Sequence, residues 1–146
     1  MEFLNLASLK LIGLMIKIIY NNWLCIYRHH HHSINEFNNY LEDVIKKISS
    51  ENKLVYLAGD FNIDILKNNE KCIDDFLDLI YSHSLYPLIL RPTRITDKSE
   101  TLIDNIFTND LNNIGGILMF DTSDHLPNFT MTRKKIKLNK DDNHLR

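Results

Sequence analysis

Residues 53–62, KLVYLAGDFN, join an apolar run to a polar turn, and the rest of the chain can be placed around them. Lys53 to Ala58 predicts a short buried strand that ends in Gly59. Asp60 and Asn62 follow two residues apart, so an extended backbone would place both side chains on one side. A carboxylate and a carboxamide together can hold an attacking water, with Asp60 taking its proton and Asn62 orienting it.

Two amphipathic helices flank this strand in the sequence. Ser33 and Glu36 have the spacing of a capping box and predict the start of the first helix, of about four turns. Its apolar residues recur at three- and four-residue steps: Ile34, Phe37, Leu41, Val44, Ile45 and Ile48. The second helix is expected from Glu70 to His83, with Ile73, Phe76, Leu77 and Ile80 on its buried face. The alternation with strands predicts one α/β domain.

The other segments are predicted to be strands. Lys10 to Tyr20 and Trp23 to Arg28 are β-rich runs, and Asn21-Asn22 between them favours a hairpin. Pro87 interrupts Leu85 to Leu90, which predicts an edge strand or irregular structure. Three more strands are expected at Leu102 to Thr108, Ile114 to Phe120 and Asn128 to Arg133, and the polar tail 134–146 is expected to be disordered.

Composition sets limits on location and partners. The 146 residues carry a formal charge of −2, so a nucleic-acid partner would need a local basic patch. Cys25 and Cys72 form no CxxC pair, which favours reduced thiols in a nuclear or cytoplasmic protein. Lysines bound the apolar segment Leu11 to Ile16, which is too short to cross a membrane, and Glu2 has the wrong sign for a signal peptide. His29 to His32 is expected to be a polar loop.

Two further blocks contain side chains suited to phosphate chemistry. Asp124 and His125 lie in Ser123-Asp124-His125-Leu126-Pro127. His125 could place a cation against the charge that develops on a phosphate, and Asp104, in residues 101–107, could fix its tautomer. Asp124 could bind Mg²⁺ through hard oxygen ligands. Each block alone is more typical of an ordinary turn or a capped strand than of a functional site.

In this order the blocks resemble the endonuclease/exonuclease/phosphatase superfamily, which includes apurinic/apyrimidinic endonucleases and deoxyribonuclease I. They are most similar to the endonuclease domain of non-LTR retrotransposons. The resemblance runs from about Leu11 to Thr132 and rests on Cys25 to Arg28, Gly59 to Asn62, Arg91 to Arg94, Thr101 to Phe107 and Ser123 to Pro127. It implies a four-layer α/β/β/α sandwich over residues 11–133 that lacks its first strands, and metal-dependent hydrolysis of DNA phosphodiesters.

The resemblance also implies roles at individual positions. Asp60 is the general base or water-positioning residue, with Asn62 beside it. Asp104 orients His125. Tyr27 matches the active-site tyrosine of the family, which lies close to the scissile phosphate.

The expected metal is Mg²⁺ or Mn²⁺, and the expected partner is the DNA backbone. Asp60, Asn62 and Asp124 are the predicted metal ligands. Arg91 and Arg94 are the predicted substrate-binding residues, although they are equally consistent with an ordinary solvated face.

Two departures from the family pattern predict weak or no activity. A Pro-Pro or Pro-Asn pair usually follows the Tyr-Arg of the family, and His29-His30 stands there instead, which removes proline stiffness beside Tyr27. The early asparagine and the metal-binding glutamate of the family have no counterpart upstream of Tyr27. The expectation is that about the first third of the domain is absent, with an exposed sheet face that favours self-association.

Two alternatives stay open. One is a phosphatase or sphingomyelinase type of the same superfamily, since these share Gly-Asp-Phe-Asn and Ser-Asp-His. The other is a non-catalytic relic that binds nucleic acid or a partner, with phosphate contacts from Arg91, Arg94 and the cluster Arg133-Lys134-Lys135.

Overall fold

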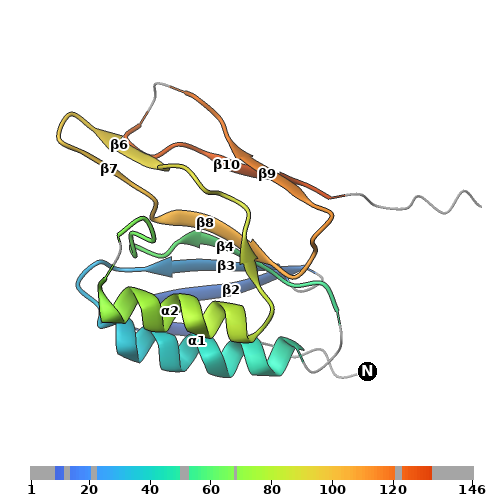
Figure 1. The fold of residues 1–146 in the computed structure, drawn as a ribbon. Helices are drawn as coiled ribbons and strands as arrows, with labels where there is room; N and C mark the ends of the chain where they lie inside the picture. Colours follow the sequence, from blue (N-terminus) through green and yellow to red (C-terminus); the bar gives the residue numbers. More distant parts are fainter. Residues whose placement is uncertain are drawn as a thin grey trace, which may run out of the picture.

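A computed structural model describes residues 9–11, 14–20, 23–49, 53–67, 69–120 and 123–132. A six-stranded mixed sheet runs through this part of the chain (Figure 1) in the order β1-β2-β3-β4-β8-β5. Its strands are β1 (Leu9–Leu11), β2 (Leu14–Tyr20), β3 (Trp23–Arg28), β4 (Tyr56–Asp60), β5 (Tyr86–Pro87) and β8 (Asp104–Thr108). β3 and β4 pair in parallel, and the other neighbours pair antiparallel. The central strand β4 is the one expected from residues 53–62.

Two predicted strand boundaries are corrected. Lys10 to Tyr20 is not one strand, because β1 and β2 pair antiparallel with Leu11 opposite Leu14. The sequence here is a nearly continuous apolar run, which gives no signal for the change in chain direction between β1 and β2. β4 begins at Tyr56 rather than Lys53, because the amide of Val55 donates to Asn109 Oδ1 at 2.8 Å, outside the ladder. The hairpin of β2 and β3 and the edge position of β5 agree with the predictions.

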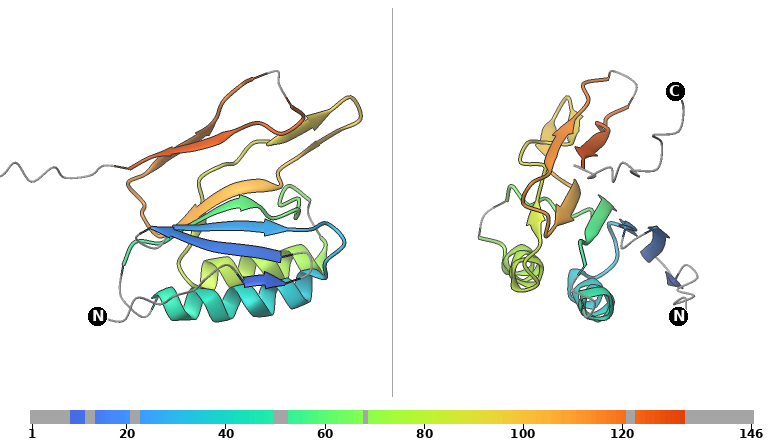
Figure 2. Two further views of the ribbon diagram at one scale, coloured as in Figure 1. Left: turned by 180° about the vertical axis from the view of Figure 1, so that it is seen from behind. Right: turned by 90° about the vertical axis from the view of Figure 1, so that its right-hand side faces the viewer.

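Both helices cover the same face of the sheet (Figures 1 and 2). α1 (Ile34–Ser49) connects the parallel strands β3 and β4, as a crossover helix does, and α2 (Lys71–Ser82) follows β4. The amide of Glu36 donates to Ser33 Oγ at 3.4 Å, which confirms Ser33 as the N-cap. The predicted apolar stripe of α1 is confirmed too, since Phe37 and Leu41 are fully buried. Among the described residues no helix is long and apolar enough to cross a membrane.

A cluster of four buried phenylalanines joins the helices to the sheet. Phe37 comes from α1, Phe76 from α2 and Phe107 from β8, while Phe61 follows β4. The ring of Phe61 meets those of Phe76 and Phe107 at centroid distances of 5.7 and 5.1 Å. The pair with Phe107 is edge-to-face, an arrangement with defined geometry, and the pair with Phe76 is tilted. Phe61 is therefore a fixed anchor between Asp60 and Asn62.

The other strands form two hairpins that lie beyond β4 and β8, away from the helices (Figures 1 and 2). They are β6 (Arg94–Thr96) with β7 (Ser99–Thr101), and β9 (Ile114–Ile117) with β10 (Asn128–Met131). Exposed apolar side chains occur on and beside β9 and β10: Ile114, Leu118, Met119, Phe120 and Met131. Self-association through such a face stays a prediction. The predicted tail 134–146 lies outside the described residues.

Candidate active site

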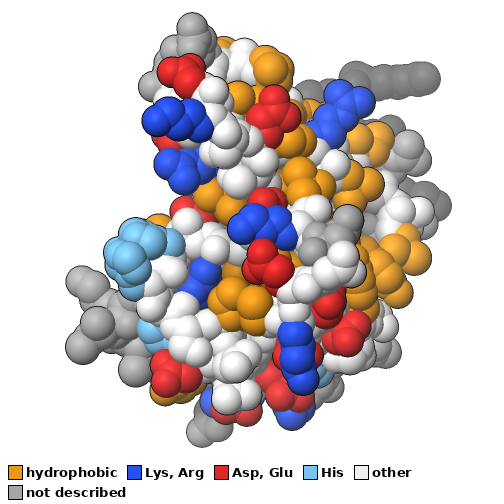
Figure 3. All heavy atoms as spheres, turned by 60° about the vertical axis from the view of Figure 1, so that its left-hand side comes forward, with side chains coloured by type: hydrophobic (Ala, Val, Ile, Leu, Met, Phe, Trp, Pro, Cys, Tyr) orange, Lys and Arg blue, Asp and Glu red, His pale blue; other side chains and the backbone are white. Residues whose placement is uncertain are grey.

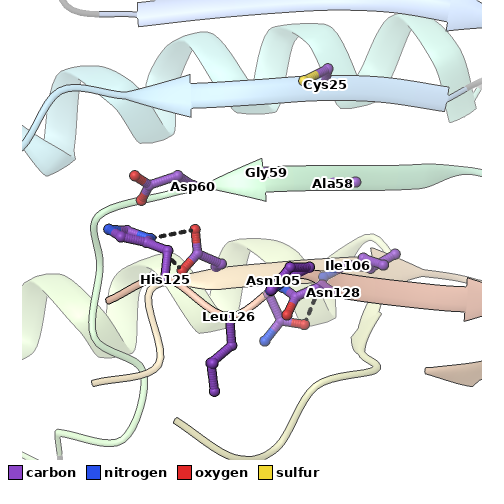
Figure 4. Close-up of a pocket in the computed structure, with 11 residues that line it drawn as sticks. Cys25, Ala58, Gly59, Asp60, Asn105, Ile106, His125, Leu126 and Asn128 are labelled. Carbon is purple, nitrogen blue, oxygen red and sulfur yellow. Dashed lines mark hydrogen bonds and ion pairs between the residues drawn. The ribbon is translucent and has the colours of Figure 1, made fainter. Parts of the chain in front are cut away.

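Three adjacent strands bring Tyr27, Asp60 and Asp104 to one end of the sheet. Tyr27 is the register partner of Asp60 across β3 and β4, and Asp60 is the partner of Asp104 across β4 and β8. The hairpin loop before β10 adds His125, which points toward Asp60 in Figure 4. A cavity of about 430 Å³ extends from these residues along the sheet, with Cys25, Ala58, Ile106 and Leu126 in its wall. The site is thus held by rigid strands and one loop.

Gly59 permits the close packing that places Asp60. Its φ is +152°, which side chains rarely adopt. A Cβ at this position would overlap the backbone carbonyl of Ile26 on the neighbouring strand. Glycine is therefore required directly before the first site residue.

His125 is held by Asp104, and Asp104 is held by Thr93. His125 Nδ1 lies 3.0 Å from Asp104 Oδ2. The buried hydroxyl of Thr93 donates to that same oxygen at 2.9 Å and accepts from the amide of Asp104 at 3.0 Å. The carbonyl of Thr93 accepts from the amide of Leu126 at 2.7 Å, which fixes the loop that carries His125. Thr93 lies in the block Arg91 to Arg94, but nothing in the sequence of that block predicts its role.

Asp60 and Asn62 do not present their side chains side by side, contrary to the expectation from an extended backbone. Asn62 has a left-handed backbone, with φ of +49°. Its amide donates to Asp60 Oδ1 at 2.9 Å, while its side chain turns away and donates to the carbonyl of Arg28 at 2.7 Å. Desolvation by burial raises the pKa of Asp60, the amide of Asn62 partly opposes this, and the charge of Asp104 adds to it.

Arg28 stabilises this turn from its buried side through hydrogen bonds to backbone carbonyls. The sequence gives no sign of this role. Arg28 is 2% exposed as a residue. Nε donates to the carbonyl of Phe61 at 2.7 Å and Nη2 to that of Asn62 at 2.6 Å. Nη1 donates to the carbonyls of His29, at 3.3 Å, and His32. One buried cation thus connects the turn after β4 to the loop after β3.

The remaining predicted residues lie around this centre. The carboxylate of Asp124 accepts from Arg94 Nε at 2.7 Å, and this bond lowers the pKa of Asp124. Arg94 is therefore paired with Asp124 in this structure, while Arg91 is exposed. Tyr27 is 39% exposed at the end of β3. The roles predicted for these four residues stay predictions.

The donor atoms present suit a divalent cation. Among the described residues, Asp60, Asp104 and His125 place one ligand atom each within 4.8 Å of the others. Carboxylate oxygens are the ligands that Mg²⁺ and Mn²⁺ prefer. Burial first, and then the charge of Asp104, raise the pKa of Asp60, and a cation between the two carboxylates would offset both effects. The group of Asp60, Asp104 and His125 therefore fits such an ion. Asp124, which the sequence predicts as a metal ligand, is paired with Arg94.

No protein-family profile and no curated protein sequence matches the chain. Solved structures do match. The endonuclease domain of TRAS1, a telomere-specific non-LTR retrotransposon, is 14% identical with a TM-score of 0.62, covering 84% of this chain and 64% of its own. The mannosyl-6-phosphatase Bt3783 of Bacteroides thetaiotaomicron VPI-5482 is 19% identical with a TM-score of 0.53, covering 75% and 49%. An endonuclease/exonuclease/phosphatase family protein of Leptotrichia buccalis C-1013-b is 19% identical with a TM-score of 0.50, covering 82% and 54%.

The chain has the endonuclease/exonuclease/phosphatase fold, which confirms the fold predicted from the sequence blocks. It spans about half to two thirds of the length of these three structures. At these identities the likeness establishes the fold and leaves the reaction to be argued from the site.

Proposed function

We propose that this chain hydrolyses phosphodiesters in DNA with the help of Mg²⁺ or Mn²⁺, as an endonuclease of the retrotransposon type. The observation that supports this most directly is the convergence of Asp60, Asp104 and His125, whose ligand atoms lie within 4.8 Å of one another at the strand ends. The fold shared with a retrotransposon endonuclease domain supports the DNA substrate.

Each residue of the centre has a chemical task in this proposal. Asp60 accepts the proton of the attacking water, and its raised pKa makes it a better base than an ordinary aspartate. Asp104 fixes the ring of His125, which stabilises the negative charge that develops on the phosphate. A bound Mg²⁺ or Mn²⁺ supplies Lewis-acid polarisation of the phosphate oxygens. Asn62 holds the Asp60 carboxylate through its backbone amide.

Substrate contacts come from the rim of the centre. Arg91 is exposed and can meet a DNA phosphate directly. Arg94 donates to Asp124 through Nε at 2.7 Å, which leaves its Nη groups as the donors that can reach a phosphate. Tyr27 lies beside Asp60 in register and can contact the scissile phosphate.

We expect the activity to be weak. Asp124 is paired with Arg94, and Asp104 is engaged by Thr93 and His125. Asp60 accepts from the backbone amide of Asn62 and has Arg28 and His125 near it, so none of the three carboxylates is left wholly to a cation. A cation held by few carboxylates is bound loosely, and its position against the phosphate is poorly fixed.

Conversion of supercoiled plasmid to the nicked form in Mg²⁺ or Mn²⁺ tests the proposal. Asp60→Asn and His125→Ala should each abolish nicking, whereas Asp78→Asn, an exposed carboxylate on α2, should leave it unchanged. Nicking that survives both site substitutions, or a wild-type protein that never nicks at high enzyme concentration, would refute it.

Two other functions have support of their own. The shared fold with a mannosyl-6-phosphatase favours a phosphomonoesterase or sphingomyelinase type of reaction, which release of inorganic phosphate or phosphocholine would reveal. The exposed Arg91 favours a non-catalytic nucleic-acid-binding protein. Salt-sensitive DNA binding without cleavage would identify that case.

A further inference from the structure

The histidine turn, residues 29–32, lies directly after β3 and is a compact structure rather than a loose loop. The amide of His32 donates to the carbonyl of His29 at 2.9 Å, which closes the turn. Arg28 Nη1 donates to both of these carbonyls from the buried side. The fixed conformation that prolines would provide is thus provided here by a buried guanidinium.

This backbone gathers three imidazoles on the outer side of the turn. The ring centroids of His29 and His30 are 4.4 Å apart, those of His30 and His31 3.8 Å, and those of His29 and His31 5.3 Å. His30 and His31 are exposed. Figure 3 shows one group of histidine side chains, in pale blue, that projects from this face.

His32 is separate from this group. Its Nδ1 lies 3.2 Å from the carbonyl of Ser33, and its Nε2 lies 3.7 Å from Glu36 at the start of α1. The three rings of His29, His30 and His31 therefore form a cluster of their own, which the proposed hydrolysis does not use.

We propose that His29, His30 and His31 bind a transition-metal cation of the Zn²⁺, Ni²⁺ or Cu²⁺ class. Imidazole nitrogens are preferred ligands of these ions, and clustered rings lose little additional freedom when they are bound together. The rings of His29 and His30 stack and the other two pairs are tilted, so the nitrogens do not converge; within the described residues the three-ligand group under 4.8 Å is that of Asp60. Exposed side chains change rotamer within nanoseconds, so the rings can turn inward without moving the braced backbone.

This site and the carboxylate centre should select different cations. Mg²⁺ prefers hard oxygen ligands in an octahedron and has little affinity for neutral imidazole. The affinity of imidazole sites rises in the order Zn²⁺ or Ni²⁺ to Cu²⁺. The histidine turn should therefore bind Cu²⁺, Ni²⁺ and Zn²⁺ but not Mg²⁺.

Calorimetric titration of the full chain, purified without any affinity tag, with NiCl₂ or ZnCl₂ at pH 7.5 tests the site. We expect one cation per chain at the histidine turn, whatever the carboxylate centre binds in addition, and a loss of affinity at the turn of about tenfold or more in the double variant His30→Asn/His31→Asn. Both rings are exposed, so this variant should fold normally, and an unchanged melting temperature without metal confirms that it does.

Two control variants make the result specific. His83→Asn removes a histidine at the C-terminal end of α2, and Asp104→Asn alters the carboxylate centre. Both should keep the binding event that the double variant loses, with the affinity of the wild type. The proposal is wrong if the wild type does not bind, if the double variant binds equally well, or if Asp104→Asn is the substitution that abolishes binding. Because plasmid nicking is not measured, this result is independent of the proposed hydrolysis.

Discussion

Replacement of Arg28 by methionine should destabilise the protein by about 3–5 kcal/mol, the range seen when one partner of a buried charged interaction is removed. Methionine fills a similar volume and avoids the cost of burying a charge. That gain is outweighed here because the partners of Arg28 are backbone carbonyls, which the substitution cannot remove. The carbonyl of Phe61 is the decisive one, since Phe61 is 1% exposed and water has poor access to it.

The magnitude follows from the individual bonds. A hydrogen bond to a charged group contributes about 1.5–3 kcal/mol, and a buried acceptor left unpaired costs about 1–3 kcal/mol. The carbonyls of Asn62, His29 and His32 are less buried and can bind water, so they add little. Arg28→Lys keeps the charge but presents its donors from one atom, so it should lose less than Arg28→Met.

Urea unfolding, followed by fluorescence of the single tryptophan and by circular dichroism, measures the free energy of unfolding. Trp23 stacks on Tyr56 at a centroid distance of 4.2 Å, so its emission should report loss of the sheet. Arg91→Met, at an exposed arginine, is the control and should change stability by less than about 0.5 kcal/mol. A loss below about 1 kcal/mol for Arg28→Met would refute the reasoning, because it would mean that water satisfies the Phe61 carbonyl.

Three further substitutions test the site by the same unfolding assay or by melting temperature. Gly59→Ala should cost about 3 kcal/mol or prevent folding, because its Cβ would meet the carbonyl of Ile26, and a loss within 0.5 kcal/mol would contradict this. Thr93→Val should cost about 2–3 kcal/mol by removing the hydroxyl that binds Asp104, and Thr93→Ser only about 1 kcal/mol; equal losses would show that the hydroxyl is unimportant. Asp60→Asn should raise the melting temperature at pH 7. The raised pKa means that ionised Asp60 opposes folding at high pH, so this gain should shrink as the pH falls through the folded-state pKa toward 3.8; a gain that does not depend on pH would contradict the cause.

The elements that the sequence predicts well are those with a local signal. The apolar residues of α1 repeat at helical spacing. Ser33 directly precedes α1 and caps it by accepting from the amide of Glu36, three residues further on. The edge position of β5 follows from Pro87. The reversal between β1 and β2 has no such signal in an unbroken apolar run, and the prediction there is wrong.

In the site too, contacts that the family resemblance implies are predicted, whereas other contacts between residues distant in the sequence are not. Asp104 and His125 lie within hydrogen-bonding distance, as the resemblance implied. Neither the contacts of Arg28 with the turn after β4 nor those of the Thr93 hydroxyl could be predicted, because they join groups 34 and 11 residues apart in the sequence. Asn62 deviates because one left-handed residue reverses the direction of its side chain, and strand periodicity cannot anticipate that.

The charges around the centre explain why a cation should bind at Asp60 rather than at Asp124. Arg94 neutralises Asp124 at 2.7 Å and lowers its pKa, so this carboxylate already has a cationic partner. Asp60 loses hydration by burial and lies beside the charge of Asp104, and both raise its pKa, while the amide of Asn62 and the ring of His125 only partly oppose this. A divalent ion relieves this repulsion at Asp60, whereas at Asp124 it must first displace a guanidinium. Binding at Asp60 should accordingly weaken at a higher pH than an ordinary aspartate would require, because protonation there competes with the ion.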